Sequence, residues 1–331
     1  MAKTIRLALI TATGSDTRSY GLPLGIGCLT SYLEKQASSI PDPLEILPTE
    51  DPSAILDFRP DVVGIGSTSS CFDHAVEIAT QVKESCGARV VAGGYHASAL
   101  PHRLPEIFDA AVLGEGEETL RELLEATTRA DWSAQTLSKI PGVAFRADGA
   151  TTVNPARPLI QPLDSLPYPR RTVNPSQPNE ATLFTSRGCP YKCVFCASSR
   201  HWGRFRAFSA EYVVGEIEEI LRQFPETEHI YLLDDLFIVD RGRLRQMAAL
   251  LEERELVPRL GFRGFVRSNL VDEECCELLL RMNCRDVRFG AESASPPVLE
   301  RLKAGSATVE DHQRCIDLCN RFGIEVSASY M

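Results

Sequence analysis

Short apolar segments alternate with helical segments along most of the chain, in two blocks that a proline-rich stretch separates. This alternation is typical of a parallel sheet covered by helices, because each strand needs a crossover before the next parallel strand. In the first block we expect strands at 5–11, 44–47, 62–66, 89–92 and 110–113, and helices at 24–35, 73–84 and 117–127. The first block is therefore expected to be an α/β domain of Rossmann-like or flavodoxin-like layout, with its ligand outside the carboxyl ends of the strands.

The second block continues the alternation. We expect strands at 182–186, 229–233, 260–266, 286–289 and 325–330, with helices at 210–223, 241–253 and 273–282 and a helical region at 297–322. Five such units predict a partial (β/α) barrel, whose chemistry would lie at the strand carboxyl ends. A closed barrel needs more residues, so either the chain is truncated at its carboxyl end or the barrel is open.

The stretch between the blocks is rich in proline and contains Asp148-Gly149 between strand-like segments 142–146 and 151–154. Asp-Gly in this setting predicts a two-residue hairpin turn, and the later prolines predict an extended connector. The expected domains are therefore 1–130, a linker at 131–180, and 181–331.

Composition excludes several classes of protein. Acidic residues outnumber basic ones 45 to 35, and no run of Lys and Arg offers a face for nucleic acid. No segment approaches the roughly 18 to 20 apolar residues that cross a bilayer, so we expect no membrane partner. Eleven cysteines spread over 331 residues do not resemble a secreted disulfide scaffold. They indicate a reducing cytoplasm, with metal binding as the first explanation for any tight cluster.

Three of these cysteines, Cys189, Cys193 and Cys196, form a C-x3-C-x2-C loop directly after an expected strand. Thiolates are the usual ligands of iron–sulfur clusters, and three of them leave one iron of a cubane open to another ligand. A structural zinc site is the alternative, with His201 as its fourth ligand, but zinc loops usually come as paired knuckles. The cysteines at 275, 276, 284, 315 and 319 are better explained as unliganded core residues.

The cysteine loop, with Phe195 just before its last cysteine, resembles the signature of the radical S-adenosylmethionine (SAM) family. The resemblance implies a [4Fe–4S] cluster on the three cysteines and SAM chelated to the open iron. It also implies reductive cleavage of SAM to a 5'-deoxyadenosyl radical, with electrons from a reductase or flavodoxin-type donor.

Three later strand ends resemble family elements near SAM. Asp235 follows the second strand, where the family receives the SAM amino group. Arg267 ends the third and resembles an arginine that pairs with the SAM carboxylate. Glu292 and Ser293 belong to Gly290-Ala291-Glu292-Ser293, similar to a G-x-E-S element. Each also has a simpler explanation: a helix cap for Asp235, a surface ion pair for Arg267, and bonding to loop amides for Glu292.

Small residues crowd the loops of the first block and resemble the cobalamin-binding half of the B12-dependent radical SAM family. Any single glycine there could merely turn the chain. The resemblance implies cobalamin contacts at Gly21, Leu22, Ser67, Ser69, Gly93, Gly94, His96, Gly114, Glu115 and Gly116. The chain lacks D-x-H-x-x-G, the element that supplies a lower cobalt ligand in many B12 enzymes. His96 is therefore expected to bond within its own loop or to touch the periphery of the ligand, without binding cobalt.

With both cofactors, the resemblance implies methylation of an unactivated carbon of a small-molecule or peptide substrate, with methylcobalamin as the methyl donor and a second SAM to remethylate cobalt. Cyclisation or oxidation occurs on similar scaffolds. A methylthiotransferase is a further alternative, with Cys28, Cys71 and Cys86 as candidates for a second cluster. A cobalamin-binding or accessory protein without activity is the alternative from another class.

Overall fold

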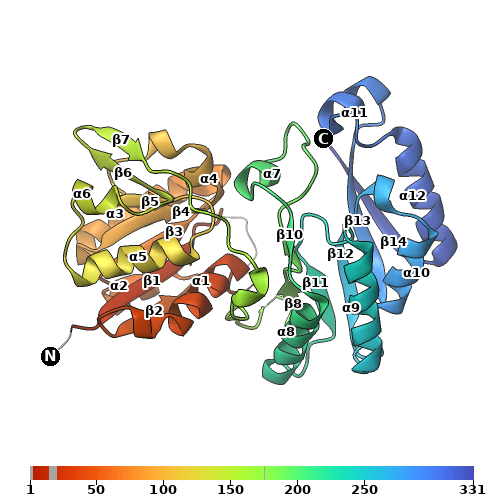
Figure 1. The fold of residues 1–331 in the computed structure, drawn as a ribbon, viewed down its shortest axis with the longest axis horizontal. Helices are drawn as coiled ribbons and strands as arrows, with labels where there is room; N and C mark the ends of the chain where they lie inside the picture. The colour runs from red at the N-terminus through yellow and green to blue at the C-terminus, as the bar shows by residue number, and fades with distance from the viewer. Residues whose placement is uncertain (1–2, 15–20, 175) are drawn as a thin grey trace. The chain divides into compact units, whose positions relative to one another are not determined.

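The computed structural model describes residues 3–14, 21–174 and 176–331. The chain divides into two compact units (Figure 1). The first unit comprises Met1–Gln161 and Ser165–Ser176, and the second comprises Pro162–Asp164 and Gln177–Met331. Within the described residues, none of the helices combines the length and apolar character needed to cross a bilayer.

The first unit is built on a seven-stranded sheet in the order β2-β1-β3-β4-β5-β6-β7. The pairs among β2, β1, β3, β4 and β5 are parallel, and the last two pairs are antiparallel. The order 2-1-3-4-5 is that of flavodoxin-like folds, as expected. The strands are β1 (Ile5–Thr11), β2 (Leu44–Pro48), β3 (Val62–Gly66), β4 (Arg89–Gly93), β5 (Ala110–Val112), β6 (Val143–Ala147) and β7 (Ala150–Val153).

Helices cover both faces of this sheet, because successive strand residues point to opposite sides. Leu7 and Leu9 pack in one apolar cluster with residues of α1 and α5, whereas Ala8 and Ile10 pack in the other with residues of α2 and α3. The helices are α1 (Leu24–Lys35), α2 (Pro52–Phe58), α3 (Phe72–Cys86), α4 (Gly94–Ala99), α5 (Glu117–Thr128) and α6 (Ala134–Leu137). The sequence did not predict α2, α4 and α6, which are too short for a helical period to show.

The hairpin predicted at Asp148-Gly149 is present. Both turn residues have positive φ, 51° and 78°, as a two-residue turn of this kind requires. Its strands were expected to belong to a linker, but β6 pairs with β5 and extends the first sheet. The reason is that Val143 and Phe145 carry the apolar cluster of the sheet one strand further.

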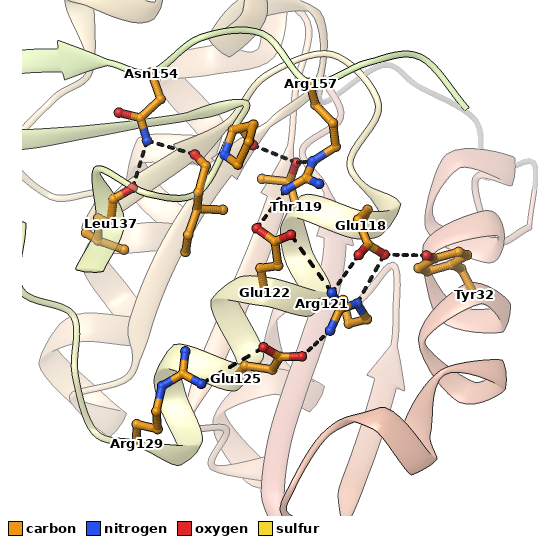
Figure 2. A network of polar contacts seen from close by, with 12 residues as sticks. Tyr32, Glu118, Thr119, Arg121, Glu122, Glu125, Arg129, Leu137, Asn154 and Arg157 are labelled. Carbon is orange, nitrogen blue, oxygen red and sulfur yellow. Dashed lines mark hydrogen bonds and ion pairs between the residues drawn. The ribbon is translucent and has the colours of Figure 1, made fainter. Parts of the chain in front are cut away.

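Polar contacts fix the connector after β7 to the first unit (Figure 2). Arg157 donates to the Thr119 hydroxyl at 2.9 Å and to the Glu122 carboxylate at 2.8 Å, both on α5. The buried Asn154 amide donates to the carbonyls of Leu137 and Ile140, at 2.7 Å each. Residues 154–157 of the connector therefore belong to the folded first unit.

The second unit contains a five-stranded parallel sheet in the order β14-β13-β12-β11-β8. Its outer strands, β14 and β8, each have one neighbour, so the sheet of the described residues is open. The strands are β8 (Glu180–Leu183), β11 (His229–Leu232), β12 (Gly261–Phe265), β13 (Cys284–Glu292) and β14 (Glu325–Tyr330). A separate antiparallel pair, β9 (Ser186–Arg187) and β10 (Arg206–Ala207), flanks the cysteine loop.

The helices of the second unit are α7 (Ser198–His201), α8 (Ala210–Gln223), α9 (Arg241–Glu253), α10 (Glu273–Arg281), α11 (Pro296–Lys303) and α12 (Val309–Phe322). The helical region expected at 297–322 is two helices. Ala304 and Gly305 have φ of 53° and 70°, which ends α11, and Thr308 with Asp311 forms a capping box that starts α12. The turn between these helices lies in the candidate site.

Candidate active site and cofactor sites

The cysteine loop runs from β9 to α7, and its three cysteines are half-buried and free. Gly188 enters the loop with φ of 84°, and a Cβ there would lie 2.7 Å from the Arg204 carbonyl oxygen. Only glycine fits this turn without a shift of backbone. Within the loop, the Cys196 amide donates to the Cys193 carbonyl at 3.1 Å. The local backbone is thus folded to present three thiols from one short segment.

The donor set suits an iron–sulfur cluster. Burial raises the pKa of the Cys189 thiol, while the Tyr191 amide and the Arg267 charge act in the opposite direction. Iron, when bound, would favour the thiolate form, as metal ions do for coordinating thiols. Among the described residues, no group of three or more Cys, His, Asp or Glu side chains is placed to hold a metal ion, and this includes the three cysteines of the loop. His201 packs edge-on against Trp202.

Arg267 lies next to the cysteine loop, just after β12, and is 8% exposed. Its Nη1 donates to Cys193 Sγ at 3.4 Å, its Nη2 donates to Ser306 Oγ at 2.5 Å, and its guanidinium carbon lies 3.8 Å from the centre of the Tyr191 ring. The buried Nε has no hydrogen-bond partner among the described residues. Arg267 is therefore not the surface ion pair of the simpler explanation, and it keeps one donor for a ligand.

The two adjacent carboxylates after β11 have different surroundings. Asp234 is 1% exposed and accepts from the Thr185 amide and hydroxyl, at 2.6 Å each, and from the Ser186 hydroxyl. It ties the end of β11 to the segment before the cysteine loop. Asp235 reaches the surface and accepts from the Ser198 hydroxyl, and the protein around its carboxyl raises its pKa. Asp240, rather than Asp235, caps α9.

Glu292 ends β13 in a left-handed conformation, with φ of 63°. Its Oε1 accepts from Lys303 Nζ at 2.8 Å, and the two side chains are 10% and 7% exposed. A Cβ on Gly290 would lie 2.1 Å from that same oxygen. The glycine of the G-x-E element thus leaves room for the carboxylate two residues later. Ser293 stays local, and its hydroxyl accepts from the Ser295 amide at 3.2 Å.

In the first unit, the backbone segments at the ends of β3 and β4 lie close together at Ser67 and Gly94. Gly94 has φ of 84°, and a Cβ there would lie 2.8 Å from the Ser67 carbonyl oxygen. Ser67 is 4% exposed, and its buried Oγ has no partner among the described residues. A Cβ on Gly93 would meet open space. Buried hydroxyls are rarely left unpaired, so this edge fits a polar ligand that a crevice of small residues admits.

His96 bonds within its own loop. Its Nδ1 lies 3.0 Å from Ser69 Oγ, and its ring stacks on Phe72 with 3.7 Å between ring centres. Burial lowers the pKa of His96, so the imidazole is neutral at neutral pH.

Other residues assigned to cobalamin from the sequence also hold the connector. A Cβ on Gly21 would lie 3.1 Å from the Thr172 carbonyl oxygen, and the Leu22 amide donates to the Thr172 hydroxyl at 2.8 Å. Glu115 accepts from the Ile160 amide at 2.9 Å. Gly116 precedes α5 as its N-cap, whereas a Cβ on Gly114 would meet no atom within 4 Å. Gly21, Leu22 and Glu115 therefore have structural contacts of their own.

Sequence reasoning missed Lys303, Ser306 and His312, which contact the candidate SAM residues or their neighbours. His312 bridges two strand ends: its Nδ1 lies 2.7 Å from Ser268 Oγ, and its Nε2 lies 3.2 Å from the Ala291 carbonyl oxygen. None of the three belongs to a recognisable motif. Only the fold brings them to the strand ends.

Each half of the chain matches a known protein family. A family model of the radical SAM superfamily matches residues 183–331, and one of the B12 binding domain matches residues 11–124. An uncharacterised methyltransferase from Pyrococcus horikoshii is 32% identical over 325 residues, which cover 94% of this chain and 69% of that protein. The anaerobic magnesium-protoporphyrin IX monomethyl ester cyclase of Rubrivivax gelatinosus is 27% identical over 84% of this chain and 52% of its own length.

Solved structures agree with the fold. The radical SAM methyltransferase TsrM from Kitasatospora setae, with cobalamin and a [4Fe–4S] cluster bound, has a TM-score of 0.80 at 20% identity, over 98% of this chain and 66% of that one. OxsB, with aqua-cobalamin and SAM bound, has a TM-score of 0.81 at 21% identity, over 99% and 49%. The chain spans about half to two thirds of the length of most of these relatives. It belongs to the radical SAM superfamily, among the members in which a B12-binding domain precedes the radical SAM domain.

Proposed function

We propose that the chain forms the cofactor-binding part of a cobalamin-dependent radical SAM methyltransferase. The first unit would bind cobalamin, and the second would bind a [4Fe–4S] cluster and SAM. The observation that carries this proposal is the contact between Arg267 and Cys193, because it brings a candidate SAM residue to a candidate cluster ligand. Most of the relatives are methyltransferases by name, including proteins from Pyrococcus and Streptomyces, and this supports methylation.

In the second unit, Cys189, Cys193 and Cys196 would hold three irons and leave the fourth for SAM. Arg267 would offset thiolate charge through Nη1 and offer Nε to the SAM carboxylate. Asp235 and Glu292 would accept from SAM donor groups, and Phe195 and Ser293 would line the site. When bound, the reduced cluster supplies the electron that cleaves SAM to methionine and a 5'-deoxyadenosyl radical, and cobalamin carries the methyl group.

In the first unit, the edge formed by the ends of β3, β4 and β5 would receive cobalamin. Ser67 Oγ would gain the hydrogen bond it lacks, and Gly93, Gly94 and Gly114 would let the backbone approach the corrin. Ser69 and His96 would touch the periphery of the corrin, since they already bond to each other. We assign no lower ligand to cobalt, because D-x-H-x-x-G is missing and His96 is engaged within its loop.

The substrate would be a small molecule or a peptide, and a flavodoxin-type protein or reductase would deliver the electron. None of the eleven cysteines, all of them among the described residues, is in a disulfide, which supports a reducing cytoplasm as the place of action. The cyclases among the relatives make cyclisation the outcome that the test must separate from methylation.

Anaerobic reconstitution with iron, sulfide and cobalamin, followed by reduction in the presence of SAM labelled in its methyl group, tests the proposal. We expect about four irons per chain, cobalt that survives desalting, 5'-deoxyadenosine, and label transferred from SAM to the corrinoid. Deoxyadenosine and retained cobalt without label transfer would instead favour cyclisation. About eight irons without cobalt would favour a methylthiotransferase, and the absence of deoxyadenosine would contradict the enzyme assignment.

A further inference from the structure

We propose that Lys303 is the positioning residue that holds the Glu292 carboxylate toward SAM and links it to the cysteine loop. This inference rests on the proposed function and extends it to a side chain outside the family motifs found in the sequence. Lys303 ends α11, eleven residues after Glu292. Lysine is almost never fully buried in proteins unless it is paired, whereas Lys303 is 5% exposed.

The pair itself is confined. Lys303 Nζ donates to Glu292 Oε1 at 2.8 Å, and that oxygen lies 2.1 Å from the position that a Cβ of residue 290 would take. The same hypothetical Cβ would lie 3.3 Å from Lys303 Nζ. Gly290 therefore provides the space that the ion pair occupies. The left-handed backbone of Glu292, with φ of 63°, directs its side chain back over this glycine.

The pair leaves half of the carboxylate available. Lys303 uses Oε1, and Oε2 accepts from no side chain of the described residues. Without the ammonium group, a carboxylate that is 10% exposed would keep its charge uncompensated, which is strongly unfavourable. It would rotate toward water, and Oε2 would lose its orientation. Lys303 thus keeps the Glu292 carboxylate in place.

The turn that carries Lys303 also contacts the cysteine loop and the end of β12. The Leu302 carbonyl accepts from the Val194 amide at 3.0 Å, and Lys303 Nζ lies 5.6 Å from the centre of the Phe195 ring. Ser306 Oγ accepts from Arg267 Nη2 at 2.5 Å and donates to the Lys303 carbonyl. We call residues 302–306 the bracing turn, because they connect the cysteine loop, Arg267 and Glu292.

Lys303→Met tests the role of the ammonium group, with Lys303→Arg as the conservative variant and Arg301→Met as the matched control on the exposed side of α11. Reconstituted proteins are compared for iron content, thermal unfolding and SAM affinity by calorimetry without reductant, so no turnover is needed. We expect Lys303→Met to keep its iron but to bind SAM about tenfold or more weakly, the effect of losing a charge-assisted hydrogen bond. Lys303→Arg should recover part of the affinity, and Arg301→Met should match the wild type.

A double-variant comparison separates positioning of Glu292 from general packing. In a Glu292→Gln background the carboxylate charge is gone, so adding Lys303→Met should not weaken SAM binding further. This double variant removes both buried charges and therefore also serves if Lys303→Met alone fails to fold. Additive losses, or unchanged SAM affinity in Lys303→Met, would overturn the inference. Failure of the wild type to bind SAM would overturn the proposed function and the inference together, whereas a difference confined to the variants concerns Lys303 alone.

Discussion

Single residues at the strand ends show why particular side chains are required there. Residue 290 must be glycine because a Cβ there would lie only 2.1 Å from the Glu292 Oε1 atom. The buried Ser67 hydroxyl has no hydrogen-bond partner among the described residues. Gly290 leaves room for the Glu292 carboxylate. The Ser67 hydroxyl would be available to hydrogen-bond a ligand.

Gly290→Ala should displace Glu292 and Lys303. A methyl group 2.1 Å from the Glu292 Oε1 position cannot be accommodated without movement of the ion pair. We expect SAM affinity to fall about tenfold or more, as for loss of a charge-assisted hydrogen bond, while iron content stays unchanged. Calorimetric titration of the reconstituted protein with SAM measures this. Gly305→Ala is a useful comparison, since it sits at the bracing turn in open space and with positive φ, so it tests backbone strain alone.

Ser67→Ala should separate ligand binding from stability. Because Ser67 Oγ is buried without a partner, its removal should leave the stability of the cobalamin-free protein unchanged or raise it slightly. Cobalamin affinity should fall about two- to tenfold, the contribution of one hydrogen bond. Equilibrium dialysis with hydroxocobalamin measures this affinity. Ser98→Ala is the contrast: the Ser98 hydroxyl bonds Gly94 and Gly114, so stability should drop, and an equal drop in Ser67→Ala would contradict our reading of Ser67.

At the scale of elements, the positions of the loops depend on hydrogen bonds that fix the neighbouring strands and connectors. The hairpin β6–β7 and the connector after it complete the first unit, and Asn154 fixes the two carbonyls that precede the hairpin. His312, from α12, holds the ends of β12 and β13 beside Arg267 and Glu292. Each contact holds a segment next to candidate site residues.

Asn154→Leu should destabilise the first unit by about 1–3 kcal/mol, because two buried carbonyls lose their donor. The two tryptophans make this measurable: Trp132 lies in the first unit and Trp202 in the second. In a Trp202→Phe background, urea unfolding followed by Trp132 fluorescence reports the first unit. Gln135→Ala, an exposed change on the neighbouring α6, should leave the midpoint unchanged. A shift no larger than that of Gln135→Ala would contradict the role assigned to Asn154.

His312 should make the second unit less stable in mild acid. Burial lowers its pKa below the ordinary 6.5; Lys303 and Arg267 act in the same direction, and Asp311 and the Ala291 carbonyl oppose them. As pH falls through about 6.5, the unfolded chain takes up a proton that the folded state does not, so stability falls until the folded-state pKa is reached. In a Trp132→Phe background, Trp202 fluorescence follows this unfolding.

His312→Gln provides the reference for that titration. Its free energy of unfolding should be lower than that of the parent at pH 7.5, and the difference should narrow as pH falls toward 5.5, by at most about 1.4 kcal/mol per pH unit. A difference that stays constant over this range would show that His312 does not titrate between the folded and unfolded states.

At the scale of the whole molecule, much of the architecture could be predicted from the sequence. Strands such as Val62–Gly66 and helices such as Ala210–Gln223 lie where the apolar pattern indicated, because local periodicity reflects which face is buried. The cysteine loop could be predicted as well, because its three cysteines lie within eight consecutive residues. The bracing turn was not, since Lys303 and Glu292 meet only after α11 folds back. Nor could the sequence show that Asp234 is a buried structural carboxylate while Asp235 is exposed.

The chain joins a B12-binding domain to a radical SAM domain, and the proposed function places a cluster with an open iron on the three loop cysteines of the second. Electron paramagnetic resonance of the reduced, reconstituted chain, recorded with and without SAM, tests the open iron most directly. We predict a reduced [4Fe–4S] signal that changes when SAM is added and that is lost in Cys193→Ala. A signal that SAM leaves unchanged, or that persists in Cys193→Ala, would contradict the account.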